Sequence, residues 1–270
     1  MGLYDEIDRI TEKQINKTET GDNRILGVVL GLVAKNYDKN MPGRVCVTVP
    51  VRDSNANELK WARVSMPSSG SKWGHYFLPE VGDQVLLAFE QGNIERPYVI
   101  GCIPKDSNRF LSGAVDQDNQ YKEIVTKYGN TIIFEDNKEG EGEKDKISIM
   151  TAKQSHQVIL DNENHKIILS DKDKKNKIEM LTESGNINIV CEKKITIKVG
   201  DSIEITLNGS SGAVSVECNK LEVKASQSLN AKTDGMAKLS GANTIIEASS
   251  TFKASSSGVV IVEGAPIKIG

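Results

Sequence analysis

The chain has 270 residues, enough for one large or two modest domains. Its hydrophobic content of 38% and charged content of 26% fit a soluble protein, and its formal net charge of −3 gives no electrostatic reason to expect nucleic acid or an anionic membrane surface as a partner. Acidic residues interrupt the first 20 positions, and no stretch approaches the roughly 18 apolar residues of a membrane span. We therefore expect synthesis in the cytoplasm, and any role outside the cell would need delivery by a machine.

The first 23 residues predict a short amphipathic helix or a docking tail. Leu3, Ile7 and Ile10 stand at i, i+4 and i+7 with charged residues between them, which is the spacing of one apolar helix face. So short a helix is not stable alone in water, so it either docks on another surface or frays. A disordered tail is the alternative.

Residues 24–105 predict a small closed barrel. Apolar residues alternate in Arg44–Val49 and at Val85, Leu87 and Phe89, and turn signals such as Gly92–Pro97 separate the runs. About five short strands within about 80 residues favour a barrel of the oligonucleotide/oligosaccharide-binding (OB) type. Six of the seven prolines and both tryptophans lie in this stretch, whereas Phe252 is the only aromatic residue after Phe134. A second architecture therefore follows the first.

Residues 106–120 predict a linker, and residues 121–270 predict a repeat of short strands. Pairs of apolar residues two positions apart recur along the second segment, with Gly, Asn, Asp, Lys or Ser between them. The clearest pairs are Val158/Leu160, Ile167/Leu169, Ile178/Met180, Ile187/Ile189, Ile195/Ile197, Ile203/Ile205, Val214/Val216, Leu221/Val223, Val259/Ile261 and Ile267/Ile269. Each unit is one strand with an apolar and a polar face, followed by a turn.

The repeat predicts an oligomer, because one ribbon of such strands encloses no core. The near absence of large aromatic residues requires a narrow interior. Three ribbons wound into a triangular prism would bury their apolar faces at a common axis. A monomeric solenoid is the alternative, although it usually has longer coils. The predicted fold is all-β: an N-terminal OB barrel, then an intertwined triple-stranded β-helix in a homotrimer.

Motifs within residues 42–101 resemble the VgrG and phage baseplate assembly protein V family, the spikes of type VI secretion systems and contractile tails. In order, they are Pro42-Gly43-Arg44-Val45-Cys46-Val47, Trp61-Ala62-Arg63-Val64, the stretch from Trp73 to Phe89, and the stretch from Gly92 to Gly101. The Tyr128-Gly129-Asn130 strand and the ending from Gly264 to Ile269 also look like the start and finish of that family's β-helix. The resemblance covers nearly the whole chain.

The resemblance implies a structural protein and not an enzyme: the membrane-piercing needle of a contractile injection machine. Fused relatives carry a large hub ahead of the OB barrel, and here only about 23 residues precede it, so we expect a separate hub protein that docks on Leu3, Ile7 and Ile10. We expect assembly in the cytoplasm and then incorporation into an extracellular or injected particle. The target cell envelope would be met on firing.

A cone-shaped tip protein of the PAAR-repeat type is a further partner that the resemblance implies. A prism that ends on the pair Ile267/Ile269 would expose strand edges and apolar side chains, which favour aggregation unless covered. The expected docking residues are Val262, Glu263, Gly264, Ala265, Pro266, Ile267, Lys268, Ile269 and Gly270. A blunt end is the alternative.

The sequence contains no recognisable catalytic or metal-binding motif, and we expect no cofactor and no metal. His75, His156 and His165 lack partners at any motif spacing, and we interpret the last two as solvent-facing turn residues. The acidic stretch 135–145 lacks the spacing of a calcium loop and predicts a solvated hairpin, and residues 172–175 predict a solvated turn. The cysteines are far apart and predict single thiols: Cys46, Cys102, Cys191 and Cys218.

Two other functions stay open as alternatives. A nucleic-acid-binding OB protein needs a basic groove with stacking aromatic residues, for which Trp61, Trp73 and Tyr76 are candidates. The resemblance implies instead that the two tryptophans pack in the barrel. A β-helical surface adhesin would need an export signal, which the first 20 residues do not provide.

Overall fold

The structure is a computed structural model that describes residues 24–49, 59–105 and 109–268. The chain divides into two compact units, residues 1–194 and residues 195–270. Strands dominate the described residues, as predicted for an all-β protein, and the helical elements are one to two turns long: η1 (Glu90–Gly92), α2 (Arg109–Ala114) and η2 (Ala152–Gln154). None of these described helices has the length and apolar character needed to cross a membrane.

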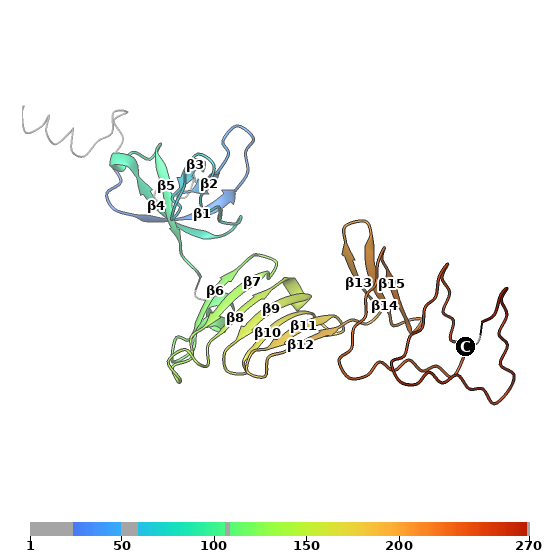
Figure 1. Cartoon of the computed structure of the whole chain (residues 1–270). Coiled ribbons are helices and arrows are strands. Elements are labelled where there is room, and N and C mark those ends of the chain that lie inside the picture. The colour runs from blue at the N-terminus through green and yellow to red at the C-terminus, as the bar shows by residue number, and fades with distance from the viewer. Residues whose placement is uncertain (1–23, 50–58, 106–108, 269–270) are drawn as a thin grey trace, which may run out of the picture. The chain divides into compact units, whose positions relative to one another are not determined.

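The first five strands close into a barrel in the order β1-β2-β3-β5-β4, with β4 paired to β1 (Figure 1). Neighbouring strands are antiparallel except β3 and β5, which are parallel. This five-stranded Greek-key barrel has the OB architecture that the sequence predicts. The strands are β1 (Val29–Lys35), β2 (Arg44–Thr48), β3 (Leu59–Val64), β4 (Gln84–Phe89) and β5 (Pro97–Cys102).

Alternate side chains of the barrel strands point inward and form its core. The predicted faces are confirmed, since Val45 and Val47 on β2 and Val85, Leu87 and Phe89 on β4 are all buried. The remaining buried members of the cluster are Val33, Val49, Ala62, Ile94 and Val99. Each buried Val, Leu, Ile or Phe contributes roughly 1.5–3 kcal/mol, so the barrel has a hydrophobic core of its own.

The predicted turn between β4 and β5 fixes one end of the barrel. Gly92 has a φ of +76°, and a Cβ at this position would lie 2.9 Å from the Cβ of Arg24 and 3.1 Å from the carbonyl oxygen of Ile25. The carbonyl oxygen of Gly92 accepts a hydrogen bond from the Ile25 N–H at 3.0 Å. Glycine is therefore required here by both backbone conformation and space.

Strands β6 to β12 form a seven-stranded antiparallel meander, in which each strand pairs with the next along the chain (Figure 1). Their bounds are β6 (Tyr121–Val125), β7 (Thr131–Glu135), β8 (Lys146–Met150), β9 (His156–Asp161), β10 (Lys166–Asp171), β11 (Lys177–Leu181) and β12 (Asn186–Val190). Over these strands one chain supplies all the strand pairing itself. The predicted repeat of strand and turn is confirmed here.

The second unit contains a three-stranded sheet in the order β13-β14-β15. Its strands are β13 (Lys194–Val199), β14 (Ile203–Asn208) and β15 (Ala213–Glu217). Residues 218–268 follow and contain neither helix nor strand. The predicted pairs Leu221/Val223 and Val259/Ile261 lie in this segment and form no strand within one chain, because alternation alone makes no ladder without a neighbouring strand.

We predict that Gly92→Ala destabilises the barrel by about 1–3 kcal/mol, because Ala is strained at positive φ and its Cβ meets the backbone. Gly101→Ala is the matched control, since a Cβ added at Gly101 in β5 would have no other atom within 4 Å. Tryptophan fluorescence during denaturant unfolding measures the stability of the barrel, because Trp61 lies within β3 and Trp73 lies in the loop between β3 and β4. Equal effects of the two substitutions would contradict the assigned role of Gly92.

Candidate functional site

One face of the seven-stranded sheet carries two continuous ladders of apolar side chains. Strand register places the members of each ladder directly opposite one another. The first ladder is Ile124, Ile132, Ile149, Val158, Leu169, Ile178 and Ile189; the second is Phe134, Ile147, Leu160, Ile167, Met180 and Ile187. We call these residues the apolar face.

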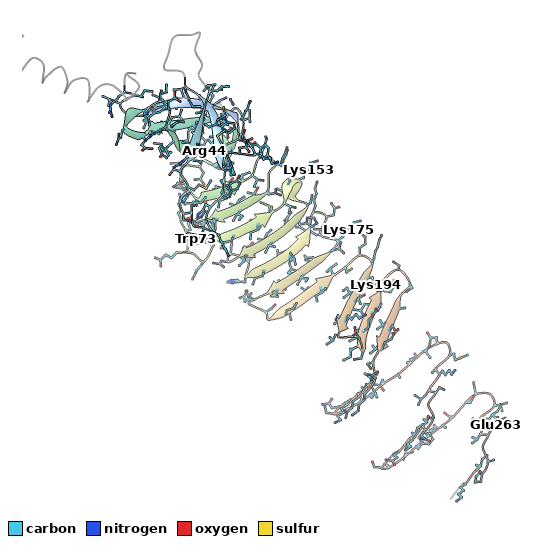
Figure 2. All side chains as sticks on the ribbon, turned by 90° about the horizontal axis from the view of Figure 1, so that it is seen from above. Arg44, Trp73, Lys153, Lys175, Lys194 and Glu263 are labelled. Atoms are coloured by element: carbon cyan, nitrogen blue, oxygen red, sulfur yellow. The ribbon has the colours of Figure 1, made fainter. Side chains whose placement is uncertain are left out.

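The apolar face is uncovered in the single chain. Ile187 is 64% exposed, Ile189 58% and Leu169 51%, and of the whole set only Ile132 and Val158 are half-buried. Figure 2 shows the strands side by side as one broad surface. Monomeric soluble proteins rarely expose a contiguous apolar patch of this extent, so the apolar face is a candidate interaction site.

The opposite face of the same sheet is mixed: it carries a ladder of charged residues beside a central ladder of Ile133, Ser148, Ile159 and Ile168. Glu135, Lys146, Asp161 and Lys166 stand opposite one another on β7 to β10, so charges of alternating sign follow each other across the strands. Lys146 also donates to Glu163 at 2.8 Å. This hydrogen bond and the carboxylates of Asp161 and Glu135 raise the pKa of Lys146. Opposite charges on facing residues favour this register of the strands.

Carboxylates at the strand ends close the hairpin turns. Asp171 accepts hydrogen bonds from the Lys175 N–H at 2.9 Å, the Asn176 N–H at 3.2 Å and the Asn176 side-chain amide at 2.6 Å. The bond from the Asn176 side chain, helped by the backbone N–H groups, lowers the pKa of Asp171. Lys174 has a φ of +57° within this turn. The turn predicted at residues 172–175 is confirmed, and its residues are exposed.

The second unit repeats the pattern on a smaller scale. Ile205 stands opposite Val216, and Leu207 stands opposite Val214, so one face of β14 and β15 is again apolar. Leu207, Val214 and Val216 are exposed. Apolar residues in the segment 218–268 are exposed as well, among them Leu221, Ile245, Phe252 and Val259.

The structure describes only some of the predicted docking residues. Leu3, Ile7 and Ile10 lie outside the described residues, as do Ile269 and Gly270 of the predicted tip site. Residues 262–268 are described and exposed, with Val262 and Ile267 as their large apolar members. Both docking sites stay predictions.

The ionisable side chains occupy structural positions. Both histidines are exposed to solvent as predicted, and His165 lies in a turn with a φ of +51°. The predicted turn position is wrong for His156, which is the first residue of β9 and pairs with Asp171 of β10. Within the described ranges, no three His, Cys, Asp or Glu side chains are grouped to hold a metal ion. In the predicted acidic hairpin, Glu139 pairs with Lys144 at 2.8 Å. All four cysteines are free thiols, and burial raises the pKa of Cys46.

The prediction that both tryptophans pack in the barrel is wrong for Trp73. Trp61 is half-buried on β3, whereas Trp73 is 68% exposed in the long loop between β3 and β4 (Figure 2). The Trp73 ring lies against Gly70, where a Cβ would come within 2.5 Å of it. Trp73 is thus held by its own loop and contributes nothing to the barrel core.

Comparison with known proteins agrees with the architecture of the barrel. Residues 29–103 match the family described as the type VI secretion system/phage-baseplate injector OB domain, and these residues include all five barrel strands. The barrel is therefore similar to an injector OB domain. The resemblance to the VgrG and phage baseplate assembly protein V family is confirmed over this region.

Three curated proteins match part of the chain, two of them named as type VI secretion system spike proteins and one as a toxin. The type VI secretion system spike protein VgrG1a of Pseudomonas aeruginosa is 36% identical over 50 residues, which is 18% of this chain and 8% of that protein. The spike protein VgrG2a of the same organism is 29% identical over 91 residues, 33% of this chain and 11% of that protein. The actin cross-linking toxin VgrG1 of Vibrio cholerae is 31% identical over 83 residues, 30% of this chain and 8% of that protein. The matches thus span about a tenth of these relatives' length.

We predict that Asp171 stabilises the sheet in a pH-dependent way. Because its pKa is lowered in the folded state, the contribution is present above the ordinary carboxyl pKa of about 3.9 and is lost as the pH falls through the folded-state value. The thermal midpoint of the wild type should exceed that of Asp171→Asn at pH 7, and this difference should shrink below about pH 4. Asp173→Asn, in the same exposed turn, is the control and should show no such difference. A difference for Asp171→Asn that does not change with pH would contradict the prediction.

Proposed function

We propose that the chain is the central spike of a contractile injection apparatus of the phage-tail or type VI secretion kind. In this role it is a structural needle that opens the target envelope, and it is not an enzyme. The observation that carries the proposal is the uncovered apolar face, which follows an injector OB domain in the same chain. A protein built to be driven through an envelope needs a rigid shaft, and a sheet that buries one whole face in an assembly provides one.

The apolar face supports a homotrimeric prism. Three copies of the sheet, each forming one wall, would turn their apolar ladders toward a common axis and leave the face with the charged ladder outside. Strands β7 to β12 each offer two apolar side chains across their width, which suits a narrow interior. Burial contributes roughly 1.5–3 kcal/mol per large apolar side chain, and three copies multiply this gain.

The segment 218–268 supports intertwining of the three chains beyond the sheets. Its apolar residues are exposed, and it contains neither helix nor strand within one chain. Backbone N–H and C=O groups need partners wherever they are buried, and neighbouring copies would supply them. The triple-stranded β-helix would then follow the walls formed by β6 to β12.

The finer parts of the proposal concern partners. A separate hub protein would dock on Leu3, Ile7 and Ile10, and a PAAR-type tip protein would dock on residues 262–270. The spike would be assembled in the cytoplasm and then become part of an extracellular or injected particle. The resemblance to the spike family supports these assignments, and the exposed Val262 and Ile267 fit the tip site.

We predict a mass of three times 29.5 kDa in sedimentation equilibrium. Ile187→Asp should abolish this assembly, because three carboxylates would be buried without partners at a cost of several kcal/mol each. The neighbour on the polar side, Asn186→Asp, is the control and should leave the trimer intact. Both positions are exposed in the single chain. If both variants kept the trimer mass, the apolar face would not be the interface. A stable dimer would show that two sheets, and not three, cover each other.

We predict that deletion of residues 264–270 leaves the trimer intact and removes the tip protein. Most of the proposed trimer contacts lie on β6 to β12, so the deletion should not change the sedimentation mass. Co-purification of a co-expressed PAAR-type protein measures the tip contact. A truncated spike that still retains that protein would refute docking at residues 262–270.

A further inference from the structure

A pair of arginines stands on the outer face of the barrel, on the side opposite its core. Arg44 on β2 and Arg63 on β3 are directly opposite partners in the strand register, and Tyr98 on β5 is the next partner of Arg63. The neighbouring positions Val45 and Ala62 are fully buried in the core, so alternation along the strands directs both arginines outward. Figure 2 labels Arg44 on the barrel.

These two arginines differ from the other cations around them. Arg96 pairs with Glu90 at 3.2 Å, and Lys60 pairs with Glu95. In the part of the chain that the structure describes, Arg44 and Arg63 form no ion pair. Like charges directly opposite each other on neighbouring strands are destabilising. The pair is therefore a local excess of positive charge that an anion would relieve.

The surface around the pair is hollowed. Arg44 and Arg63 line a groove of about 280 Å³ together with Trp61, Pro97 and Tyr98. Glu90, Glu95 and Arg96 line the same groove. Trp61 is half-buried and offers a flat apolar surface beside the guanidinium groups. The outer face of the second and third strands is also where OB folds commonly bind their ligands. The groove thus combines positive charge, aromatic surface and a usual ligand-binding position.

We propose that this groove binds an acidic segment of a partner protein, with Arg44 and Arg63 each holding one carboxylate. A guanidinium group matches a carboxylate in two parallel hydrogen bonds, and cross-strand neighbours are close enough to hold two carboxylates of one extended segment. Trp61 and Tyr98 pack against an apolar side chain between them. None of the residues of this groove belongs to the apolar face.

The carboxylates of the groove favour a peptide over nucleic acid. A nucleic acid strand brings a continuous row of phosphates, and single-stranded binding sites usually follow that row with a positive groove. Here Glu90 and Glu95 interrupt the positive surface, and Tyr98 donates its hydroxyl proton to Glu90 at 3.0 Å. Two isolated carboxylates can avoid these glutamates, whereas a phosphate chain that crosses the groove meets them.

Fluorescence anisotropy on the full chain tests the proposal with three labelled probes. They are a ten-residue peptide of alternating glutamate and leucine, its glutamine counterpart, and a ten-nucleotide oligo-dT. We expect the acidic peptide to bind most tightly and the double variant Arg44→Gln/Arg63→Gln to weaken it at least about tenfold. The control Lys39→Gln/Lys105→Gln removes two exposed cations outside the groove and should leave binding unchanged.

A second measurement separates binding from folding. Because the pair repels itself in the free barrel, Arg63→Gln should not lower the thermal midpoint of the unliganded protein and should still weaken the acidic peptide. Three outcomes would overturn the proposal: no binding of the acidic peptide by the wild type, equal binding by both double variants, or tighter binding of oligo-dT that the groove variant loses. The last would assign the groove to nucleic acid.

Discussion

The structure of residues 121–217 depends on one constraint, the strand register. Strands β7 to β12 each place two apolar side chains on the apolar face, and each hairpin aligns these with the next strand. A slip of one strand by one residue would move its members of the two apolar ladders to the other face of the sheet. The Asp171 turn, with its three hydrogen bonds, holds one such hairpin in place. The turns therefore hold the register, and the register decides which side chains share a face of the sheet.

The two architectures of the chain differ in how they are stabilised. The barrel buries Val45, Val47 and Leu87 completely and thus has a core within a single chain. The sheet has no such core, because the residues that would form it are the ones left exposed. Its stability in the proposed spike comes from association, so it depends on protein concentration in a way that the barrel does not. This division suits the proposed spike, in which the barrel would attach to other parts of the apparatus and the sheet would form the shaft.

Much of this could be predicted from the sequence, for a physical reason. Alternation with period two identifies strands and their faces, so pairs such as Ile167/Leu169 and Ile178/Met180 mark strands correctly. Alternation does not say which strand lies next to which, so the meander within one chain, the ladder from Glu135 to Lys166 and the facing Arg44 and Arg63 became visible only with the register. Trp73 was misplaced because similarity of a motif fixes a residue's position in the chain and not its exposure.

The meander has a consequence for the order of events during synthesis. Each strand from β6 to β12 pairs with its immediate neighbour in sequence, so every ladder can form as soon as the next strand leaves the ribosome. Local contacts of this kind form fast compared with contacts between distant segments. The nascent chain can then complete the seven-stranded sheet, with its apolar face exposed, before a second copy is present. Several such chains on one messenger RNA would meet their correct partners early, whereas a chain that leaves without partners keeps its apolar face exposed and is prone to wrong associations.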